Sequence, residues 1–418
     1  MPCKFVYIIG SGPGGEKLLT GEAREALDRS ECVLGADRIL ASFGELIRGK
    51  EIKAAVSCKA VVEALKESSG DTCAVLVSGD SGFFSLSRQL SPMLRAEGFE
   101  SRIICGVSSL AYFAARIGVS YDDAVINSLH GRLKSDSTES ERDRLFNRIA
   151  GLAAYNQKCF FLTDGILSPK TICHVLAGRG MENLRIRVGE RLSHPDEKIS
   201  AYTVKDAGHI NFDAPNIVFI ENAAAKSLFY GILHDSDFER GDVPMTKEEI
   251  RTVSLAKLRQ KPDSICWDAG AGTGSVSCAM ALASPYGMVY AVEKNPAAAA
   301  LILENKLKFN IHNIEIIHGK APGVLAALPP PDSVFIGGTT GALKAVITEI
   351  LARAPYARIV INAITLETLA EIQAVTAEKG FSDVEIVQIG VNFIQKAGNY
   401  SLIKAQNPVF VISFGGKV

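Results

Sequence analysis

Short apolar runs alternate with segments of helical periodicity along most of the chain, and this alternation constrains the fold more than any other feature. Residues 5–9 (FVYII), 72–79 (TCAVLVSG) and 101–105 (SRIIC) are typical of strands, and segments such as 16–27 (EKLLTGEAREAL) have helical spacing. Strands separated by helices form parallel sheets with helices on their faces. The sequence therefore predicts an α/β protein.

The chain has 418 residues, a length that suggests two or three domains. A polar stretch at 129–145 is typical of a surface crossover, and a second composition break falls at 234–242 (HDSDFERGD). We therefore predict domains at 1–230 and 240–418.

The second predicted domain contains five strand-like runs separated by helical segments. These runs are 264–270, 288–295, 314–320, 333–338 and 357–364. Two further runs, 381–393 and 407–414, follow with no helix between them, only the short polar link GNYS at 398–401. We expect them to form a hairpin that closes a parallel sheet with an antiparallel edge.

Composition excludes several classes of protein. The formal net charge is −1, so no global positive field favours nucleic acid, and no apolar run reaches the eighteen residues or so of a membrane span. Nine cysteines are scattered without a CxxC pair, and the seven histidines form no metal-binding motif. We expect a cytoplasmic protein with reduced cysteines that binds no nucleic acid, membrane or protein-held metal.

A glycine-rich loop stands where a predicted strand passes into a helix, at 267–274 (WDAGAGTG). Its glycines let the backbone approach a ligand, and Glu293, at the end of the next strand, is placed to hold ribose hydroxyls. Gly270, Gly272 and Gly274 are evenly spaced, and Ser275 stands where a dinucleotide loop would have its third glycine. This favours S-adenosylmethionine over NAD, and a tight turn beside a solvated glutamate is the structural alternative.

Five motifs in the first half resemble, in order, those of the tetrapyrrole methylase family, the class III methyltransferases. They are 10–14 (GSGPG), 78–85 (SGDSGFFS), 105–110 (CGVSSL), 129–132 (LHGR) and 192–199 (LSHPDEKI). In the second half, 244–251 (PMTKEEIR), 267–277 (WDAGAGTGSVS), 335–338 (FIGG) and 362–368 (NAITLET) resemble the decarboxylating partner domain of the same pathway. Taken together, the two halves resemble the fused, decarboxylating precorrin-6Y methyltransferase family.

The resemblance implies a class III fold of two α/β subdomains, followed by a class I Rossmann-like domain with an antiparallel terminal hairpin. It also implies methylation by S-adenosylmethionine of ring carbons 5 and 15 of a precorrin-6 type or cobalt-precorrin macrocycle. Carbon dioxide would leave from the acetate on ring carbon 12, as a step of cobalamin biosynthesis. Because the electron-rich ring carbon is itself the nucleophile, we assign no catalytic side chain.

The resemblance also implies which residues bind the cofactor. In the first domain they are Pro13, Gly79, Asp80, Ser108, Ser109 and Thr163, and in the second Thr246, Gly270, Ala271, Gly272, Thr273, Gly274, Glu293 and Ala321. Two residues depart from the family pattern. Ser81 replaces a proline, which we expect to loosen its loop, and Lys320 stands where an acidic residue often lies near the adenine.

A macrocycle with many carboxylates calls for arginine partners or polar loop residues. The candidates are Arg132 and Arg191 in the first domain, and Asn362 and Thr365 in the second. A solvated arginine or, for Thr365, a helix cap explains them nearly as well. We favour a loop-ordering role for Asp80, because an aspartate in a Gly-rich turn usually bonds its own backbone.

Two other functions remain open at this point. One is a class I nucleic-acid or small-molecule methyltransferase fused to a tetrapyrrole methylase of other specificity, which the neutral charge disfavours for nucleic acid. The other is a sensor of adenosine ligands without turnover, which complete loops in both halves disfavour. A homo-oligomer is expected under the leading interpretation.

Overall fold

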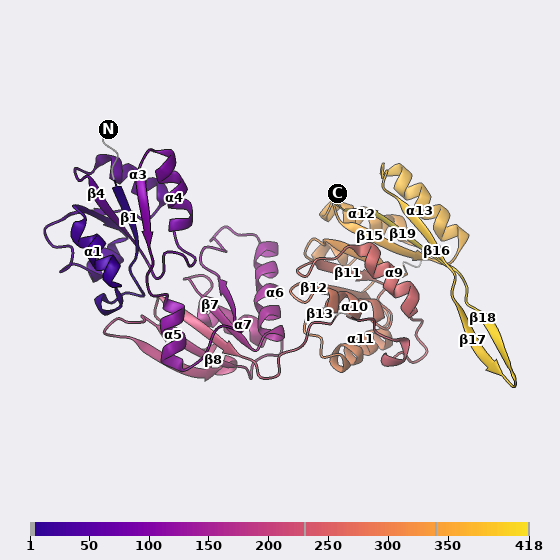
Figure 1. The fold of residues 1–418 in the computed structure, drawn as a ribbon. Helices are drawn as coiled ribbons and strands as arrows, with labels where there is room; N and C mark the ends of the chain where they lie inside the picture. Colours follow the sequence, from indigo (N-terminus) through magenta and orange to yellow (C-terminus); the bar gives the residue numbers. More distant parts are fainter. Residues whose placement is uncertain (1–4, 230, 339–340, 417–418) are drawn as a thin grey trace. The chain divides into compact units, whose positions relative to one another are not determined.

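The computed structural model describes residues 5–229, 231–338 and 341–416 (Figure 1). Contacts divide the chain into two compact units, and the division is not a single cut. The first unit comprises Met1–Ser135, Asn156–Ala177 and Met181–Ala223. The second comprises Asp136–Tyr155, Gly178–Gly180 and Ala224–Val418. The chain therefore enters the second unit at residues 136 and 178, returns to the first each time, and passes finally to the second at residue 224.

The first unit contains two five-stranded sheets. One is parallel, with strand order β3-β2-β4-β1-β5. Its elements are β1 (Phe5–Gly10), α1 (Gly21–Arg29), β2 (Cys32–Gly35), α2 (Asp37–Ser42), β3 (Glu51–Ala54), α3 (Cys58–Glu67), β4 (Thr72–Val77), α4 (Ser87–Ala96) and β5 (Glu100–Ile104). Side chains alternate between the sheet's faces, so Val6 and Ile8 pack into one apolar core and Ile9 into another.

The other sheet of this unit is mixed, with strand order β6-β7-β10-β8-β9. Its elements are α5 (Ser109–Ile117), β6 (Val125–Ser128), β7 (Lys158–Leu162), α7 (Pro169–Ala177), β8 (Arg185–Glu190), β9 (Lys198–Thr203), α8 (Val204–Ala207) and β10 (Asn216–Glu221). β6 and β7 pair in parallel, but the other pairs are antiparallel. The expectation of parallel sheets throughout is wrong here, because the link from β8 to β9 is too short for a helical crossover.

The second unit is built on a seven-stranded sheet with strand order β13-β12-β11-β14-β15-β19-β16. Its strands are β11 (Ile265–Ala269), β12 (Met288–Glu293), β13 (Ile314–His318), β14 (Ser333–Ile336), β15 (Arg358–Ala363), β16 (Glu385–Ile389) and β19 (Val409–Gly415). The first five are parallel, and β19 runs antiparallel to both β15 and β16. All five strands predicted for this part are present, and the predicted fold class is confirmed.

Helices and two apolar cores cover this sheet. The helices are α9 (Glu248–Leu258), α10 (Ser275–Ala283), α11 (Pro296–Lys308), α12 (Leu343–Arg353) and α13 (Leu366–Glu378). Trp267 and Ile359 belong to one core, and Cys266 and Val360 to the other. The central strands of the sheet are therefore buried on both faces, which explains their continuous apolar sequences.

The terminal hairpin differs in detail from the expected one. The segment GNYS contains the turn, Gly398 and Asn399, between β17 (Asn392–Ala397) and β18 (Tyr400–Ala405), and the two strands form a separate two-stranded ribbon. Figure 1 shows this ribbon in yellow, projecting away from the sheet. The antiparallel edge itself is the β16–β19 pair. The strands β17 and β18 were not distinguished in the sequence.

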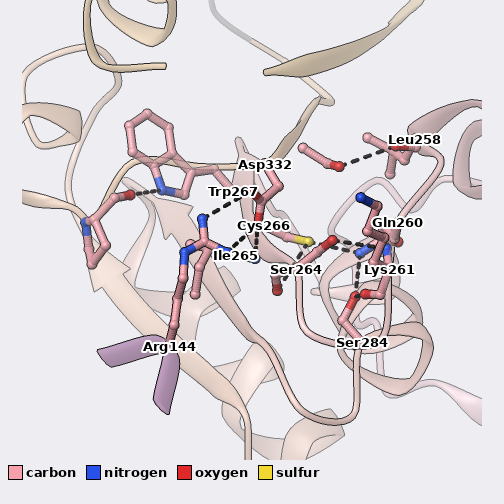
Figure 2. A network of polar contacts seen from close by, with 12 residues as sticks. Arg144, Leu258, Gln260, Lys261, Ser264, Ile265, Cys266, Trp267, Ser284 and Asp332 are labelled. Carbon is pink, nitrogen blue, oxygen red and sulfur yellow. Dashed lines mark hydrogen bonds and ion pairs between the residues drawn. The ribbon is translucent and has the colours of Figure 1, made fainter. Parts of the chain in front are cut away.

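Helix α6 (Glu139–Tyr155) belongs to the second unit, although it lies between β6 and β7 in the chain. Figure 2 shows Arg144 of this helix paired with Asp332 through two contacts, 2.8 and 3.0 Å long. Gly151 allows close packing, since a Cβ there would lie 2.5 Å from the carbonyl oxygen of Pro285. The predicted surface crossover at 129–145 is thus only partly right, because a helix begins at residue 139.

Among the residues described, no helix is long and apolar enough to cross a membrane.

Candidate functional site

Three glycine-containing loops meet at the carboxyl ends of β1, β4 and β5. Gly12 and Gly79 exchange backbone hydrogen bonds of 3.1 and 2.9 Å. A Cβ on Gly106 would lie 2.4 Å from the carbonyl oxygen of Gly10 and 2.5 Å from that of Gly79. The three loops therefore require glycine to pack together, at the sheet edge where α/β proteins bind ligands.

A cavity of about 250 Å³ lies beside these loops. It brings together all six residues predicted for the first cofactor cleft: Pro13, Gly79, Asp80, Ser108, Ser109 and Thr163. Asp80 accepts hydrogen bonds from the backbone N–H groups of Gly82 (2.7 Å) and Gly106 (3.1 Å), which fits a loop-ordering role. The Thr163 hydroxyl donates to the carbonyl oxygen of Asn216 at 2.7 Å.

Sequence reasoning missed several residues that line the same cavity. They include Arg38, Phe83, Phe84, His130 and Asn216. Phe83 and Phe84 stand inside the quoted motif SGDSGFFS, so proximity to Asp80 could have indicated them. Arg38 and Asn216 belong to none of the glycine motifs, and only the folded chain shows that they line this cavity.

Ser81, which replaces a proline of the family pattern, does not loosen its loop. Ser81 is 2% exposed, and its hydroxyl donates to the carbonyl oxygen of Ile104 at 2.8 Å. This bond ties the loop to β5. The expectation of a loosened loop is therefore not what the packing shows.

The two candidate arginines do not line this cavity. Arg191 forms an ion pair with Asp196, and Arg132 donates to the carbonyl oxygen of Ser128 at 3.3 Å. Their assignment to substrate remains a prediction.

In the second unit, the loop after β11 has three residues in the left-handed backbone region. Gly270, Gly272 and Gly274 have φ values of 84°, 57° and 77°, which L side chains rarely adopt. A Cβ on Gly270 would also lie 2.4 Å from the carbonyl oxygen of Gly338. The loop is thus held close to the end of β14, and α10 begins directly after it.

Glu293 ends β12 and lies against this loop. One carboxylate oxygen accepts from the Gly272 N–H at 2.8 Å, and the other accepts from the Asn295 N–H at 2.9 Å. The residue is only 8% exposed. Because a carboxylate has spare lone pairs after two such bonds, Glu293 can still accept hydrogen bonds from the hydroxyl groups of a ligand.

A cavity of about 310 Å³ opens beside the loop and contains part of the predicted set. Gly270, Gly272, Glu293 and Ala321 line it, together with Lys294, Asn295 and Lys320. The other predicted residues, Thr246, Ala271, Thr273 and Gly274, are not among the lining residues. They shape the loop and its surroundings, and their part in cofactor binding remains a prediction.

Asp268, which sequence reasoning did not select, is fully buried at the end of β11. Ser277 donates a hydrogen bond of 2.5 Å to its carboxylate. Burial, together with the nearby charge of Glu293, raises the pKa of Asp268 to about 7. Its position two residues before Gly270, inside the quoted loop, was the available signal.

The side chains of Asn362 and Thr365 form hydrogen bonds with other residues of the chain. The side-chain oxygen of Asn362 accepts from the Ser254 hydroxyl at 3.0 Å, and Thr365 caps α13 by accepting from the Thr368 N–H at 3.2 Å. Neither lines the cavity of the second unit. Their contact with substrate remains a prediction, and for Thr365 the geometry is that of a helix cap.

Within the described ranges, no group of three or more His, Cys, Asp or Glu side chains could hold a metal ion.

Comparison with known proteins now gives the family. Residues 5–208 match the model of the tetrapyrrole (corrin/porphyrin) methylases, and residues 237–414 match that of the precorrin methyltransferase domain. A probable cobalt-precorrin-6B C(15)-methyltransferase (decarboxylating) of Pyrobaculum calidifontis is 41% identical over 182 residues, 43% of this chain and 93% of that protein. The chain belongs to the precorrin methyltransferase family.

Similarity within this family extends along nearly the whole chain. A precorrin-6Y C(5,15)-methyltransferase (decarboxylating) of a Sinorhizobium species is 28% identical over 390 residues, 91% of this chain and 90% of that protein. A crystal structure of a precorrin-6Y C5,15-methyltransferase of Geobacter metallireducens is 35% identical, with a TM-score of 0.41, and covers 44% of this chain and 95% of its own. The family resemblance drawn from the motifs is confirmed.

Proposed function

We propose that this chain is a bifunctional methyltransferase of cobalamin biosynthesis that uses S-adenosylmethionine at both of its units. It methylates ring carbons 5 and 15 of a precorrin-6 type macrocycle and releases the carbon 12 acetate carboxylate as carbon dioxide. The observation that carries this proposal is the similarity to the Sinorhizobium C(5,15) enzyme over 91% of the chain. A separate glycine-lined cleft in each unit agrees with two methyl transfers.

The two transfers divide between the units in this proposal. The relative named as a C(15)-methyltransferase and decarboxylase matches 182 residues, close to the length of the precorrin methyltransferase match at 237–414. The relative named for both carbons matches 390 residues. We therefore assign carbon 15 and decarboxylation to the second unit, and carbon 5 to the first.

The glycine-containing loops of both units fit the cofactor. A Cβ on Gly270 or Gly106 would meet backbone atoms of a neighbouring loop at 2.4 Å, so glycine at these positions lets the loops that border each cleft pack together. Glu293, with its carboxylate at the Gly272 amide, is placed for ribose hydroxyls. The bound cofactor supplies an electrophilic methyl group.

The chain's own contribution is placement rather than nucleophilic chemistry. The loops ordered by Asp80 and Glu293 would hold the methyl donor in each cleft. Alignment of this kind is worth roughly 7–11 kcal/mol, because the reacting atoms need no further search for the right geometry. The conjugated ring accepts the electron pair left by decarboxylation, so the second unit needs no electron sink of its own.

The test uses the full-length protein with metal-free and cobalt-loaded precorrin-6 type macrocycle. Product masses count the methyl groups gained and the carbon dioxide lost. We expect two methyl groups and one carbon dioxide with at least one of the two substrates. No methyl gain on either macrocycle would refute the proposed function, and the preferred substrate identifies the metal state of the ring.

We also propose a homo-oligomer located in the cytoplasm. All twelve residues of β17 and β18 are exposed, including Ile394 (67%) and Ile403 (73%). A two-stranded ribbon alone in water is marginally stable, and a second copy of the chain would stabilise it by covering this exposed apolar surface. The eight cysteines among the described residues are free, in keeping with a reducing compartment. Light scattering of wild type and an Ile394→Ser, Ile403→Ser variant tests the assembly.

A further inference from the structure

Phe83 and Phe84 are shared by two cavities of the first unit. One is the cavity of about 250 Å³ that contains the six predicted cofactor residues. The other, of about 610 Å³, is lined by residues of the loop after β4, the start of α4 and Ile103 of β5. The two sets of lining residues have only Phe83 and Phe84 in common. The two rings therefore border both cavities.

Phe84 is an unusual residue for such a position. Its side chain is 56% exposed, although its ring packs edge-on against Phe83 with 4.7 Å between the centroids. Its backbone has φ of 51°, in the left-handed region that a bulky residue rarely adopts. A strained backbone that presents a large apolar ring to solvent is typical of a functional contact.

Two cations accompany the rings. Arg38 lines the smaller cavity and Arg88 the larger one. Among the residues that the structure describes, neither guanidinium forms an ion pair with a carboxylate. Both can therefore receive a carboxylate from a ligand.

We propose that Phe84 and Arg88 bind the macrocycle in the first unit: the ring of Phe84 contacts the flat conjugated face, and Arg88 pairs with a peripheral carboxylate. This assignment rests on the proposed function and adds the substrate side of the first site. A conjugated ring prefers an aromatic face, and the macrocycle's carboxylates need cationic partners at its rim. The shared position of Phe84 then holds the acceptor carbon at the mouth of the cofactor cavity, within the short reach that methyl transfer requires.

The test measures the KM for the macrocycle in full-length protein at saturating S-adenosylmethionine. Phe84→Gly removes the ring and suits the left-handed backbone, so the loop keeps its fold. We expect it to raise the KM for methylation at carbon 5 about 2- to 12-fold, the range of an aromatic contact. Phe84→Trp should keep the wild-type KM, and Phe84→Leu should behave like Phe84→Gly.

Arg88→Gln should raise the same KM about 2- to 5-fold, and the effect should shrink at high salt because the pair is exposed. Tyr121→Ala and Arg95→Gln are matched controls, since both side chains are exposed in the same unit and line neither cavity. Carbon dioxide release, assigned to the second unit, serves as an internal control. Its KM should stay unchanged in every variant.

Three results would overturn the inference. They are an unchanged KM in Phe84→Gly, wild-type behaviour of Phe84→Leu, or a parallel loss of S-adenosylhomocysteine binding by the first unit. That binding is measured by calorimetry in a Gly272→Arg background, which blocks the second cleft. The proposed function would fail differently, because wild-type protein would then transfer no methyl group.

Discussion

Asp332 is the residue whose removal should most disturb the contact between α6 and the sheet of the second unit. Its carboxylate pairs with Arg144 at 2.8 and 3.0 Å and also accepts the backbone N–H of Ile265 at 2.8 Å. Figure 2 shows these contacts close to Trp267, the only tryptophan of the chain. Replacing Arg144 or Asp332 by alanine therefore removes different parts of one network.

The expected magnitudes follow from exposure. The Arg144 and Asp332 side chains are each 40% exposed, so Arg144→Ala should destabilise the unit by only about 0.5–1 kcal/mol. Asp332→Ala also leaves the amide of Ile265, a residue 1% exposed, without its acceptor. An unsatisfied amide costs about 1–3 kcal/mol, so the total should be about 2 kcal/mol or somewhat more. Asp332→Asn keeps an acceptor for that amide and should resemble Arg144→Ala.

Guanidinium unfolding followed by Trp267 fluorescence measures this effect. Trp267 is fully buried in β11 and donates to the carbonyl oxygen of Pro329 at 3.1 Å, so its emission reports on the second unit. A double-mutant cycle of Arg144→Ala and Asp332→Ala gives the coupling between the two side chains. The reasoning is refuted if Asp332→Asn destabilises as much as Asp332→Ala, or if the cycle shows no coupling.

Three further predictions concern the second unit. Glu293→Ala should weaken S-adenosylhomocysteine binding there by about 1–3 kcal/mol, as measured by calorimetry; unchanged affinity would show that Glu293 has no contact with ribose. Gly272→Arg should fill the second cleft and abolish carbon dioxide release, while the first unit still binds cofactor. If Gly12→Arg stopped decarboxylation instead, the division of labour would be reversed. His312 is 8% exposed, and burial, with nearby Lys226 and other cations, lowers its pKa to about 3. Its neutral form therefore stabilises the fold fully above the unfolded pKa of about 6.5, and this contribution is lost as pH falls from there toward 3. In His312→Phe the free energy of unfolding, measured by Trp267 fluorescence, should fall less between pH 6.5 and 4 than in wild type. An equal fall in both proteins would contradict the assignment.

The sequence predicted most reliably those elements whose pattern is unambiguous. The central parallel strands of the second unit, β11, β12, β14 and β15, are buried along nearly their whole length, so a continuous apolar run such as MVYAV identifies each one. Short strands such as β2 and edge strands such as β9 were missed. The four residues of β2 give too little periodicity, and β9 (KISAYT) has no buried residue and no apolar/polar alternation in its burial.

Helix α6 escaped prediction for a physical reason. Its first turns, ESERDR, are as polar as the preceding loop, and its apolar residues begin only near Leu145. Its partners, such as Asp332 and Pro285, lie more than one hundred residues later in the chain. Neither a sequence motif nor a local hydrophobic periodicity indicates partners so distant in the chain. Only the folded chain shows that this helix belongs to the second unit.

The two clefts also differ in how much of them a sequence can reveal, and this difference follows from how each is built. In the second, the glycine loop is one continuous motif and Glu293 ends the next strand along the chain, so the sequence indicates both, although Gly319, Ala321 and Gly338 of later segments also line this cleft. The first depends on three loops that approach glycine to glycine, held by Asp80 and by Ser81. A ligand in the first cleft is therefore positioned by packing between distant segments. Substitutions that widen any one of these loops should disturb binding even where the substituted residue touches no ligand, because the other two loops lose their support.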